Sequence, residues 1–265
     1  MNKTELLNRL ASDASERLLL SRALDKLEAA RQRNVPAHTP FLSPGERAAV
    51  EELIAQSGHP RHLFFGGYEG SERTVCAFLP DWMEEEDWLS GEDCPVCALR
   101  CTFREEESLS HRDFLGSLMG QGITREKLGD ILVGTGKCDI LLLRELEPYL
   151  LQNLISAGRA RLKVSPLSLS QVEPPQVKKE LIRDTVAALR LDAVAAAAFH
   201  LSRGKAADLI SSGRLTLNYK ECLKADRTVA AGDVLACRGL GKCVVKEVPG
   251  LSKKGRIMIV LERYV

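Results

Sequence analysis

The 265-residue sequence lacks long apolar runs and has few aromatic residues, which make up 5% of the chain. No apolar stretch reaches the ~18 residues that span a bilayer. The best candidate, residues 186–201, is interrupted by Arg190 and Asp192. The first 32 residues are charged throughout and lack the apolar core of a signal peptide. These absences predict a cytoplasmic protein without a membrane partner.

Disulfide and cofactor motifs are also lacking. Eight cysteines in a chain of this length fit reduced thiols better than the framework of a small secreted domain. No Gly-x-Gly-x-x-Gly fingerprint is present. Gly134-Thr-Gly136-Lys137 precedes Cys138 and an apolar run, which predicts a hairpin turn instead of a phosphate-binding loop. We therefore expect no cofactor, no small-molecule substrate and no enzymatic activity.

One cysteine cluster is a candidate metal site. Cys94, Cys97 and Cys101, together with His111, could supply four ligands to zinc. However, no second Cys-x-x-Cys pair exists, and Cys97 and Cys101 alternate with Leu99 as one face of a strand does. A buried strand is favoured and no metal is predicted, but the sequence alone leaves the question open.

Charge is distributed unevenly along the chain, although the formal net charge is only +1. Residues 181–265 contain 15 Lys and Arg against 8 Asp and Glu, an excess of seven positive charges. The other 180 residues contain 22 basic and 28 acidic side chains. A basic C-terminal third on an acidic body indicates an anion-binding module, and a polyanion such as RNA is the leading class of partner.

The chain divides by pattern into four parts. Strands and helices alternate in the middle of the chain, and a polar stretch with three prolines separates them from the basic end. The predicted parts are an N-terminal helical segment (1–58), a central α+β domain (59–165), a linker (166–180) and a C-terminal basic module (181–265).

Local patterns predict the elements of each part. Leucines at helical spacing predict one helix over 1–32, and Ser43-Pro44-Gly45-Glu46 has the pattern of a capping box that begins a second helix. Two apolar strands over 130–143 are expected to flank a Gly-rich turn. The basic module is expected to be helical to about residue 212, with strands and turns afterwards. Further strands are predicted at 62–68, 73–79 and 96–103, and further helices at 111–119, 124–128 and 145–156.

The strongest functional pattern is Arg190-Leu-Asp192, followed after ten residues by Arg203-Gly-Lys205. It predicts two short helices, with Asp192 near the N-terminus of the first, where the helix dipole favours a carboxylate. Ser202 is expected to cap the second helix. Free amides at a helix N-terminus bind phosphate, and Arg203 and Lys205 add positive charge there. With few aromatic residues, such a surface suits the backbone of structured RNA.

The pattern continues with Leu209-Ile210, Gly213-Arg214, Leu217-Asn218 and Gly232-Asp233, and the whole series resembles the S4 RNA-binding domain over about residues 183–243. The resemblance implies an αL-type S4 fold that presents its basic helices and loop to rRNA or tRNA. Asp192 and Asn218 are expected to shape the module. Tyr219 stands where many S4 domains have Gly, which leaves the turn type open. The expected RNA-binding residues are Arg190, Ser202, Arg203, Lys205, Arg214, Lys220, Arg238 and Lys242.

A second pattern lies upstream, in Leu109-Ser-His-Arg-Asp-Phe-Leu-Gly116 and Gly122-Ile-x-Arg-x-Lys-x-Gly-Asp130. Followed at a distance by an S4 domain, it resembles the YlmH family of bacterial S4 proteins, and the combined resemblance covers about residues 40–260. The resemblance implies an RRM-like central domain, a cytosolic location and association with RNA of the large ribosomal subunit. It also implies a role in ribosome-associated quality control, in which stalled peptidyl-tRNA is handled.

The upstream pattern also suggests functional side chains. His111 and Asp113 are not expected to form a catalytic pair, because positions i and i+2 of a helix do not face each other. A helix cap at Ser110 or Asp113 is favoured. Secondary candidates for RNA contact, with plain surface exposure as the alternative, are Arg112, Arg125 and Lys127.

Together these features predict a non-catalytic α+β protein with N-terminal helices, an RRM-like central domain and a C-terminal S4 domain. Its expected partners are rRNA, tRNA and the large ribosomal subunit. One alternative is an RNA-modifying enzyme with an S4 appendage, although in such enzymes the S4 module usually precedes a larger catalytic domain, and only about 20 residues follow it here. The other is a scaffold for cell-division or other protein partners, which the basic charge disfavours.

Overall fold

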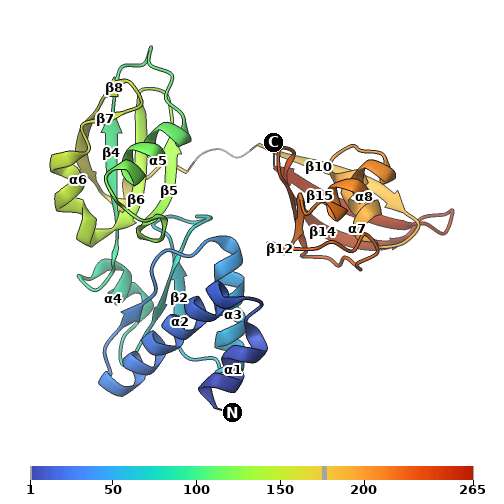
Figure 1. Cartoon of the computed structure of the whole chain (residues 1–265), viewed down its shortest axis with the longest axis horizontal. Coiled ribbons are helices and arrows are strands. Elements are labelled where there is room, and N and C mark those ends of the chain that lie inside the picture. The colour runs from blue at the N-terminus through green and yellow to red at the C-terminus, as the bar shows by residue number, and fades with distance from the viewer. Residues whose placement is uncertain (1, 175–177, 265) are drawn as a thin grey trace. The chain divides into compact units, whose positions relative to one another are not determined.

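The computed structural model describes residues 2–174 and 178–264, and the chain splits into two compact units, Met1–Pro175 and Gln176–Val265 (Figure 1). The boundary falls inside the predicted linker, 166–180, of which residues 175–177 lie outside the described residues. The rest of that stretch holds regular structure. A strand continues to Leu167, a 3-10 turn (η3) covers Leu169–Gln171, and the next strand begins at Lys179.

Three helices begin the first unit: α1 (Lys3–Leu10), α2 (Ala14–Arg33) and α3 (Pro44–Gln56). The single helix predicted over 1–32 is wrong. Asp13 begins a new helix by accepting a hydrogen bond from the Glu16 amide at 2.8 Å. The capping box predicted at Ser43 is confirmed, because the Ser43 hydroxyl accepts from the Glu46 amide and the Glu46 carboxylate accepts from the Ser43 amide.

A three-stranded antiparallel sheet lies against these helices, in the order β1 (Ala37–His38), β3 (Val75–Phe78), β2 (His62–Phe65). Cys76 and Phe78 belong to the core that the helices form. Val75 and Ala77 point to the other face and belong to a second core, shared with α4 (Glu85–Ser90) and with the central domain. The N-terminal segment and the central domain therefore fold as one unit.

The central domain is a four-stranded antiparallel sheet with the strand order β5-β6-β4-β9. Helices α5 and α6 pack on one face. The βαββαβ connection, with the last strand beside the first, is the RRM-like fold that the family resemblance implied. Its elements are β4 (Val96–Thr102), α5 (His111–Gly120), β5 (Leu128–Val133), β6 (Lys137–Leu143), α6 (Glu147–Asn153) and β9 (Lys163–Leu167).

Smaller elements complete this domain. The Gly-rich turn predicted between two apolar strands is confirmed, since β5 and β6 pair and Gly136 has a φ of +68°. The helix predicted over 124–128 is only a 3-10 turn (η1, Arg125–Lys127). The helix predicted over 145–156 is a 3-10 turn (η2, Arg144–Leu146) followed by α6, and a short hairpin follows in β7 (Ser156–Ala157) and β8 (Ala160–Arg161).

The second unit has a six-stranded antiparallel sheet and two helices, α7 (Leu191–Ala198) and α8 (Arg203–Ser211). Its strands follow the order β10-β15-β14-β13-β11-β12. The prediction of helix before residue 191 is wrong, because residues 179–186 form a strand that pairs along its whole length with β15. The strands are β10 (Lys179–Val186), β11 (Leu215–Leu217), β12 (Lys220–Glu221), β13 (Val234–Cys237), β14 (Gly241–Leu251) and β15 (Ile257–Tyr264).

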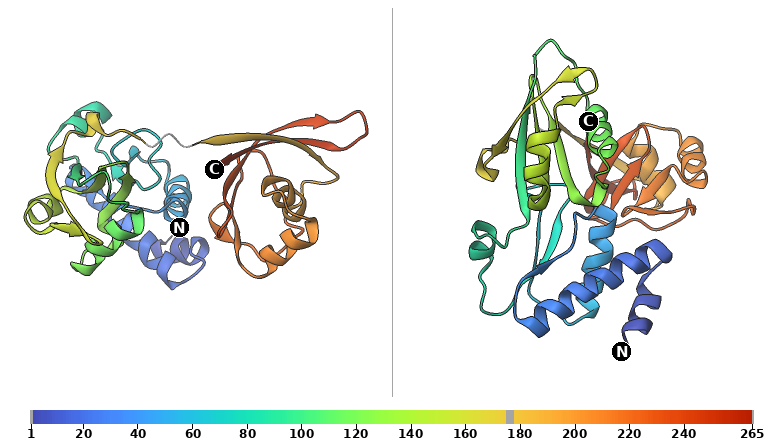
Figure 2. Two further views of the ribbon diagram at one scale, coloured as in Figure 1. Left: turned by 90° about the horizontal axis from the view of Figure 1, so that it is seen from above. Right: turned by 60° about the vertical axis from the view of Figure 1, so that its left-hand side comes forward.

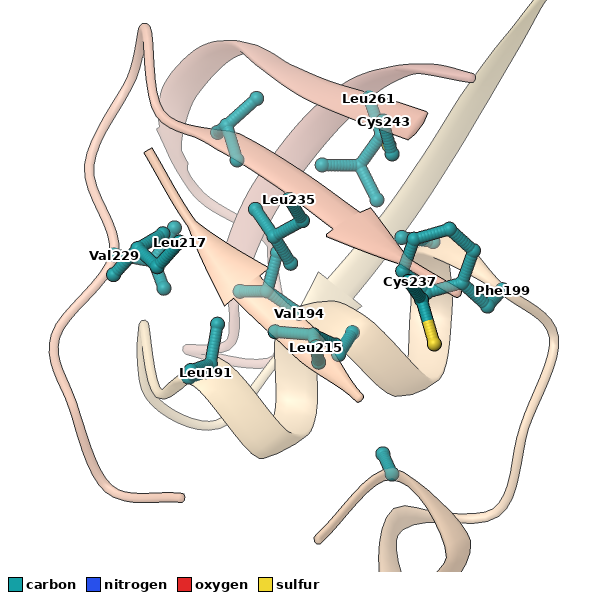
Figure 3. Packing of buried hydrophobic residues seen from close by; sticks show 14 of the residues in the cluster. Leu191, Val194, Phe199, Leu215, Leu217, Val229, Leu235, Cys237, Cys243 and Leu261 are labelled. Atoms are coloured by element: carbon teal, nitrogen blue, oxygen red, sulfur yellow. The ribbon is translucent and has the colours of Figure 1, made fainter. Parts of the chain in front are cut away.

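A single hydrophobic core joins the two helices to this sheet (Figure 3). Val194 of α7 packs against Leu215 and Leu235 of neighbouring strands, and all three side chains are fully buried. Alanines fill most of α7, so the helix lies close to the strands. This core fixes the helix starts, where the predicted RNA-binding residues lie.

Candidate nucleic-acid interface

A buried carboxylate accepts hydrogen bonds from two arginines of the second unit. The side chain of Asp192, in the first turn of α7, is only 7% exposed. Its two oxygens accept hydrogen bonds from Nε and Nη2 of Arg190 at 3.2 and 3.1 Å. They also accept from Nε and Nη2 of Arg203, at the start of α8, at 3.1 and 3.3 Å. We call this group the Arg190–Asp192–Arg203 cluster; it fixes two guanidinium groups beside each other.

The backbone around Asp192 explains why the cluster forms. No side chain caps α7. Instead, the amides of Leu191 and Asp192 donate to the carbonyls of Arg227 and Ala225 at 2.8 and 3.0 Å. The loop between β12 and β13 therefore crosses the start of α7 beside Asp192. Because these carbonyls take the first amides of α7, its N-terminus is not an open anion site.

The cluster carries a net charge of +1. Burial disfavours the charged form of Asp192, but hydrogen bonds from Arg190 and Arg203 outweigh this and hold the pKa of its carboxyl below the ordinary value. The same hydrogen bonds raise the pKa of Arg190. The guanidinium groups remain partly open to solvent, with side chains 40% and 58% exposed for Arg190 and Arg203. They are thus fixed in place and still accessible.

The start of α8 is built as the sequence predicted. Ser202 is the N-cap, and its hydroxyl accepts a hydrogen bond from the Lys205 amide at 3.3 Å. Arg203, Gly204 and Lys205 are all exposed in this first turn. A side chain at Gly204 would meet nothing within 4 Å, so the helix start is unobstructed. Helix dipole and side-chain charge here both favour an anion.

Two other predicted arginines lie together at the opposite end of α8. The Arg238 amide donates to the Arg214 carbonyl at 3.0 Å, and Nη2 of Arg214 donates to the Arg238 carbonyl at 3.3 Å. The nine residues of α8 rise about 13 Å along the helix axis and separate this pair from Arg203. The predicted arginines of the second unit therefore form two groups at the two ends of this helix.

Two other predicted lysines, Lys220 and Lys242, lie on the sheet. Lys220 is exposed on β12, opposite Leu217. Lys242 is the second residue of β14. Its ammonium lies 4.5 Å from the centre of the Tyr264 ring, which the ammonium of Lys179 also approaches at 5.0 Å. Lys242 thus also contributes to packing at the end of the sheet.

The turn between β11 and β12 is a two-residue hairpin. Asn218 and Tyr219 both have positive φ, at +51° and +63°, as the tight primed turns of hairpins require. The Asn218 amide group donates to Asp233 at 2.8 Å and its oxygen accepts from the Val234 amide at 2.8 Å. Asn218 therefore shapes the module, as expected. Tyr219 adopts the positive φ that Gly provides in many S4 domains, at the expense of backbone strain.

Sequence reasoning missed a third arginine near the cluster. Arg256 follows the turn between β14 and β15, and it lines a surface groove of about 370 Å³ together with Arg190 and Arg203. Arg256 lies 53 positions after Arg203 along the chain, outside the spacing that suggested the other residues. Its only sequence signal is the short basic run Lys253-Lys254-Gly-Arg256.

The RRM-like domain and the RNA-binding RRM domains do not expose the same surface. RRM domains bind RNA on the sheet face away from the helices, through aromatic residues. Here Ala98 and Leu141 on that face are buried in a core with Val75 and Ala77 of the small N-terminal sheet. The chain's own N-terminal layer therefore covers part of the RRM-type surface, whereas Thr102, Lys163 and Ser165 on the same face are exposed.

The upstream sequence pattern holds the RRM-like domain and the N-terminal layer together. Nη1 of Arg125 donates to the carbonyls of Leu128 and Gly129 at 3.0 and 2.9 Å. Burial, and next the nearby charge of Arg73, lower the pKa of Arg125 to about 10. A side chain at Gly129 would come within 2.8 Å of Phe41 and Leu141. The guanidinium of Arg125 thus stabilises the local backbone at the start of β5.

The carboxylate of Asp130 binds the N-terminal layer through the hydroxyl of Tyr68 at 2.7 Å. The other secondary candidates remain on the surface. Arg112 is exposed on α5, and Lys127 pairs with Glu145 at 2.9 Å. Asp113 accepts from Ser110 in a capping box, which confirms the helix cap favoured by the sequence.

The cysteine cluster is divided between two cores. Cys97 and Cys101 lie on the helix-covered face of β4, whereas Cys94 belongs to the core on the other face. Burial raises the pKa of the Cys97 and Cys101 thiols to about 12, so they remain protonated and behave as apolar side chains. Within the described residues, no group of three or more His, Cys, Asp and Glu side chains could hold a metal ion.

Most of the chain is similar to known proteins. The family described as "Putative RNA-binding domain in YlmH" matches residues 103–171, and the S4 domain matches residues 189–235. The "Ribosome-associated protein quality control protein P2" of Bacillus subtilis (strain 168) is 30% identical over 249 residues, covering 94% of this chain and 95% of that protein. The chain belongs to the YlmH family.

A solved structure agrees on the fold. The "Cell division protein ylmH from Streptococcus pneumoniae" matches with a TM-score of 0.50 and 20% identity, over 61% of this chain and 96% of that one. At that identity the likeness concerns the fold alone. The family and its two domains support RNA binding. No helix in the described part of this YlmH-family chain is long and apolar enough to cross a membrane.

Proposed function

We propose that this YlmH-family protein binds structured RNA through its S4 domain, and that its targets are rRNA of the large ribosomal subunit, tRNA, or both. The interface comprises Arg190, Ser202, Arg203 and Lys205 at the helix starts, with Arg214, Lys220, Arg238 and Lys242 around them. The protein acts by binding, without covalent chemistry. The quality-control role named for the Bacillus subtilis relative extends to this chain, with stalled peptidyl-tRNA on the large subunit as the object and the cytoplasm as the location.

The observation that carries the proposal is the Arg190–Asp192–Arg203 cluster. A free arginine loses side-chain entropy when it binds, roughly 0.5–1.5 kcal/mol for each ordered side chain. Asp192 orders both guanidinium groups before RNA arrives, at 3.1–3.3 Å. Planar guanidinium groups hydrogen-bond phosphate oxygens in pairs, so two fixed groups beside a helix N-terminus suit an RNA backbone.

Charge makes this binding dependent on salt. Each phosphate contact releases counterions, so the logarithm of the affinity should fall linearly with the logarithm of the salt concentration. The second unit has few aromatic side chains, with Phe199, Tyr219 and Tyr264 its only ones in the sequence. Stacking on splayed bases is therefore a minor contribution, and the interface suits folded RNA.

Sedimentation of bacterial lysate through a sucrose gradient tests the proposal. The unaltered chain should migrate with large subunits at low salt and partly dissociate at moderate salt. The double variant Arg190→Gln/Arg203→Gln should stay near the top of the gradient. The matched control, Lys26→Gln/Arg33→Gln, removes two exposed charges from α2 and should migrate as the unaltered chain does.

A second measurement separates the two RNA targets. Fluorescence anisotropy with purified tRNA should show binding that the Arg190→Gln/Arg203→Gln variant loses if tRNA is a target in its own right. Absence of the unaltered chain from ribosomal fractions at both salt concentrations, together with no tRNA binding, would refute the proposed function.

A further inference from the structure

The groove beside the cluster joins the S4 helices to a hairpin outside the S4 match. The S4 match ends at residue 235, whereas β14 and β15 follow it. The groove runs between the end of β10 and the outer side of α7. Arg190 and Arg203 lie on its helix side, and Arg256 reaches it from the hairpin. Three arginines from separate parts of the chain thus line one hollow.

Arg256 is held in this groove by the edge strand. Its Nε donates to the Thr185 hydroxyl at 3.1 Å and its Nη2 donates to the Thr185 carbonyl at 2.7 Å. Thr185 belongs to β10, which is the end strand of the sheet among the described residues. Like the two cluster arginines, Arg256 is exposed and fixed by partners in the protein.

Small side chains form the floor of the groove. Ala193, Ala196 and Ala197 of α7 and Ala187 and Ala188 before it line the hollow, so a ligand backbone can approach the helix closely. Asp184 is the acidic residue that lines it, against three arginines. Among the residues that the structure describes, no aromatic side chain lines it. This lining suits a chain of phosphates and sugars better than stacked bases or an apolar peptide.

The turn of the hairpin continues the basic surface. Val186 at the end of β10 pairs with Ile257, so residues 252–256 project past the end of that strand. In the left view of Figure 2 the red hairpin extends beyond the end of β10. The turn is ordered by hydrogen bonds between Ser252 and Arg256, and Lys253 and Lys254 are exposed on it.

We propose that the groove and the β14–β15 turn form a second part of the RNA interface, which takes the sugar–phosphate backbone of a double-helical RNA. Arg256 contacts a phosphate in the groove together with Arg190 and Arg203. Lys253 and Lys254 contact the backbone further along the same helix. This inference rests on the proposed function, since it assigns an additional surface to the same RNA partner.

Binding of the full chain to purified bacterial large subunits, measured over a series of salt concentrations, tests the inference. Arg256→Gln should weaken binding roughly tenfold and reduce the slope of log affinity against log salt by about 1. Lys253→Gln/Lys254→Gln, which alters no hydrogen bond of the turn, should reduce the slope by about 2. Lys246→Gln is the matched control, because Lys246 is exposed on β14 but lines a different hollow of the sheet.

The outcomes separate this inference from the proposed function. Loss of binding by Arg190→Gln/Arg203→Gln, with Arg256→Gln and the double lysine variant both equal to Lys246→Gln, would overturn the inference and leave the proposed function standing. No binding by the unaltered chain would overturn both. Circular dichroism of each variant monitors folding, and the double lysine variant keeps the test decisive if Arg256→Gln unfolds the hairpin.

Discussion

The substitution Asp192→Asn tests whether RNA binding depends on the fixed arrangement of Arg190 and Arg203 or on their charge alone. The substitution keeps the shape of the side chain but removes the charge that accepts four hydrogen bonds at 3.1–3.3 Å. It also adds one unit of net positive charge, which by itself should strengthen binding to RNA. The two effects act in opposite directions, so the sign of the result is informative.

The magnitudes favour weaker binding. A unit charge about 7 Å from a phosphate interacts by about 0.6 kcal/mol in water, and salt reduces this further, so the added charge gives less than a roughly threefold gain. Ordering one long side chain on binding costs about 0.5–1.5 kcal/mol. Since Asp192→Asn frees two arginines, we expect RNA affinity to fall roughly tenfold.

The same substitution should destabilise the second unit. Removing one partner of a fully buried ion pair costs about 3–5 kcal/mol. Arg190 and Arg203 are 40% and 58% exposed and can turn toward water. We therefore expect a loss of about 1–3 kcal/mol at neutral pH for Asp192→Asn.

The pH dependence of this loss has a defined sign. Burial raises the pKa of Asp192, but hydrogen bonds from the two arginines lower it more, so the net pKa lies below the ordinary value of 3.8. A carboxylate of this kind stabilises the fold above its unfolded pKa, and the contribution disappears as the pH falls through the folded pKa. The difference in stability between the unaltered chain and Asp192→Asn should therefore shrink below about pH 4.

The assay must report on the second unit alone. Trp82 and Trp88 both lie in the first unit, so tryptophan fluorescence is blind to this change. Hydrogen exchange of the α7 and α8 amides measures local stability, and anisotropy with labelled RNA measures affinity. Asp226→Asn is the control. Exposed Asp226 has a Coulombic interaction with Arg190, and its substitution changes the net charge by the same amount as Asp192→Asn. Equal or tighter RNA binding by Asp192→Asn than by Asp226→Asn would refute the reasoning.

Three further outcomes are expected. Tyr219→Gly should stabilise the second unit by about 1 kcal/mol, because Gly adopts positive φ without strain; faster hydrogen exchange in the β11–β12 hairpin would contradict this. Asp139→Asn should destabilise the first unit by about 2 kcal/mol, since the Asp139 side chain is 4% exposed and accepts two hydrogen bonds at 2.7 Å from Arg100. An unchanged midpoint of urea unfolding, followed by Trp88 fluorescence, would count against that value. Iodoacetamide should alkylate Cys222 first, because the other seven cysteines are buried, and equal labelling of several cysteines by mass spectrometry would disprove it.

Local patterns predicted the features that depend on neighbouring residues. The capping box at Ser43 and the Gly-rich turn before Lys137 follow from hydrogen bonds and backbone angles within a few positions. The start of α8 at Arg203, with Ser202 as its cap, was predictable for the same reason. The helix over 1–32 was mispredicted because leucine spacing continues across the break at residues 11–13.

Features that depend on distant pairing were not predictable in this way. Strand β10 pairs with β15, more than 70 positions further along the chain, so its own periodicity did not distinguish it from a helix. The contacts of Arg125 were hidden for a different reason, because its partners are nearby backbone carbonyls, which the identity of the side chains does not reveal.

The sequence by itself placed the cations at the helix starts, because the spacing of charged and apolar residues along short helices specifies them, and its resemblance to the YlmH family implied the RRM-like and S4 folds. Only the tertiary structure decided which surfaces are open. Packing of the small N-terminal sheet covers part of the RRM face, since both faces of its strands are apolar. Folding of the C-terminal hairpin onto β10 brings Arg256 to the Arg190–Asp192–Arg203 cluster, because long-range strand pairing places residues that no local pattern connects.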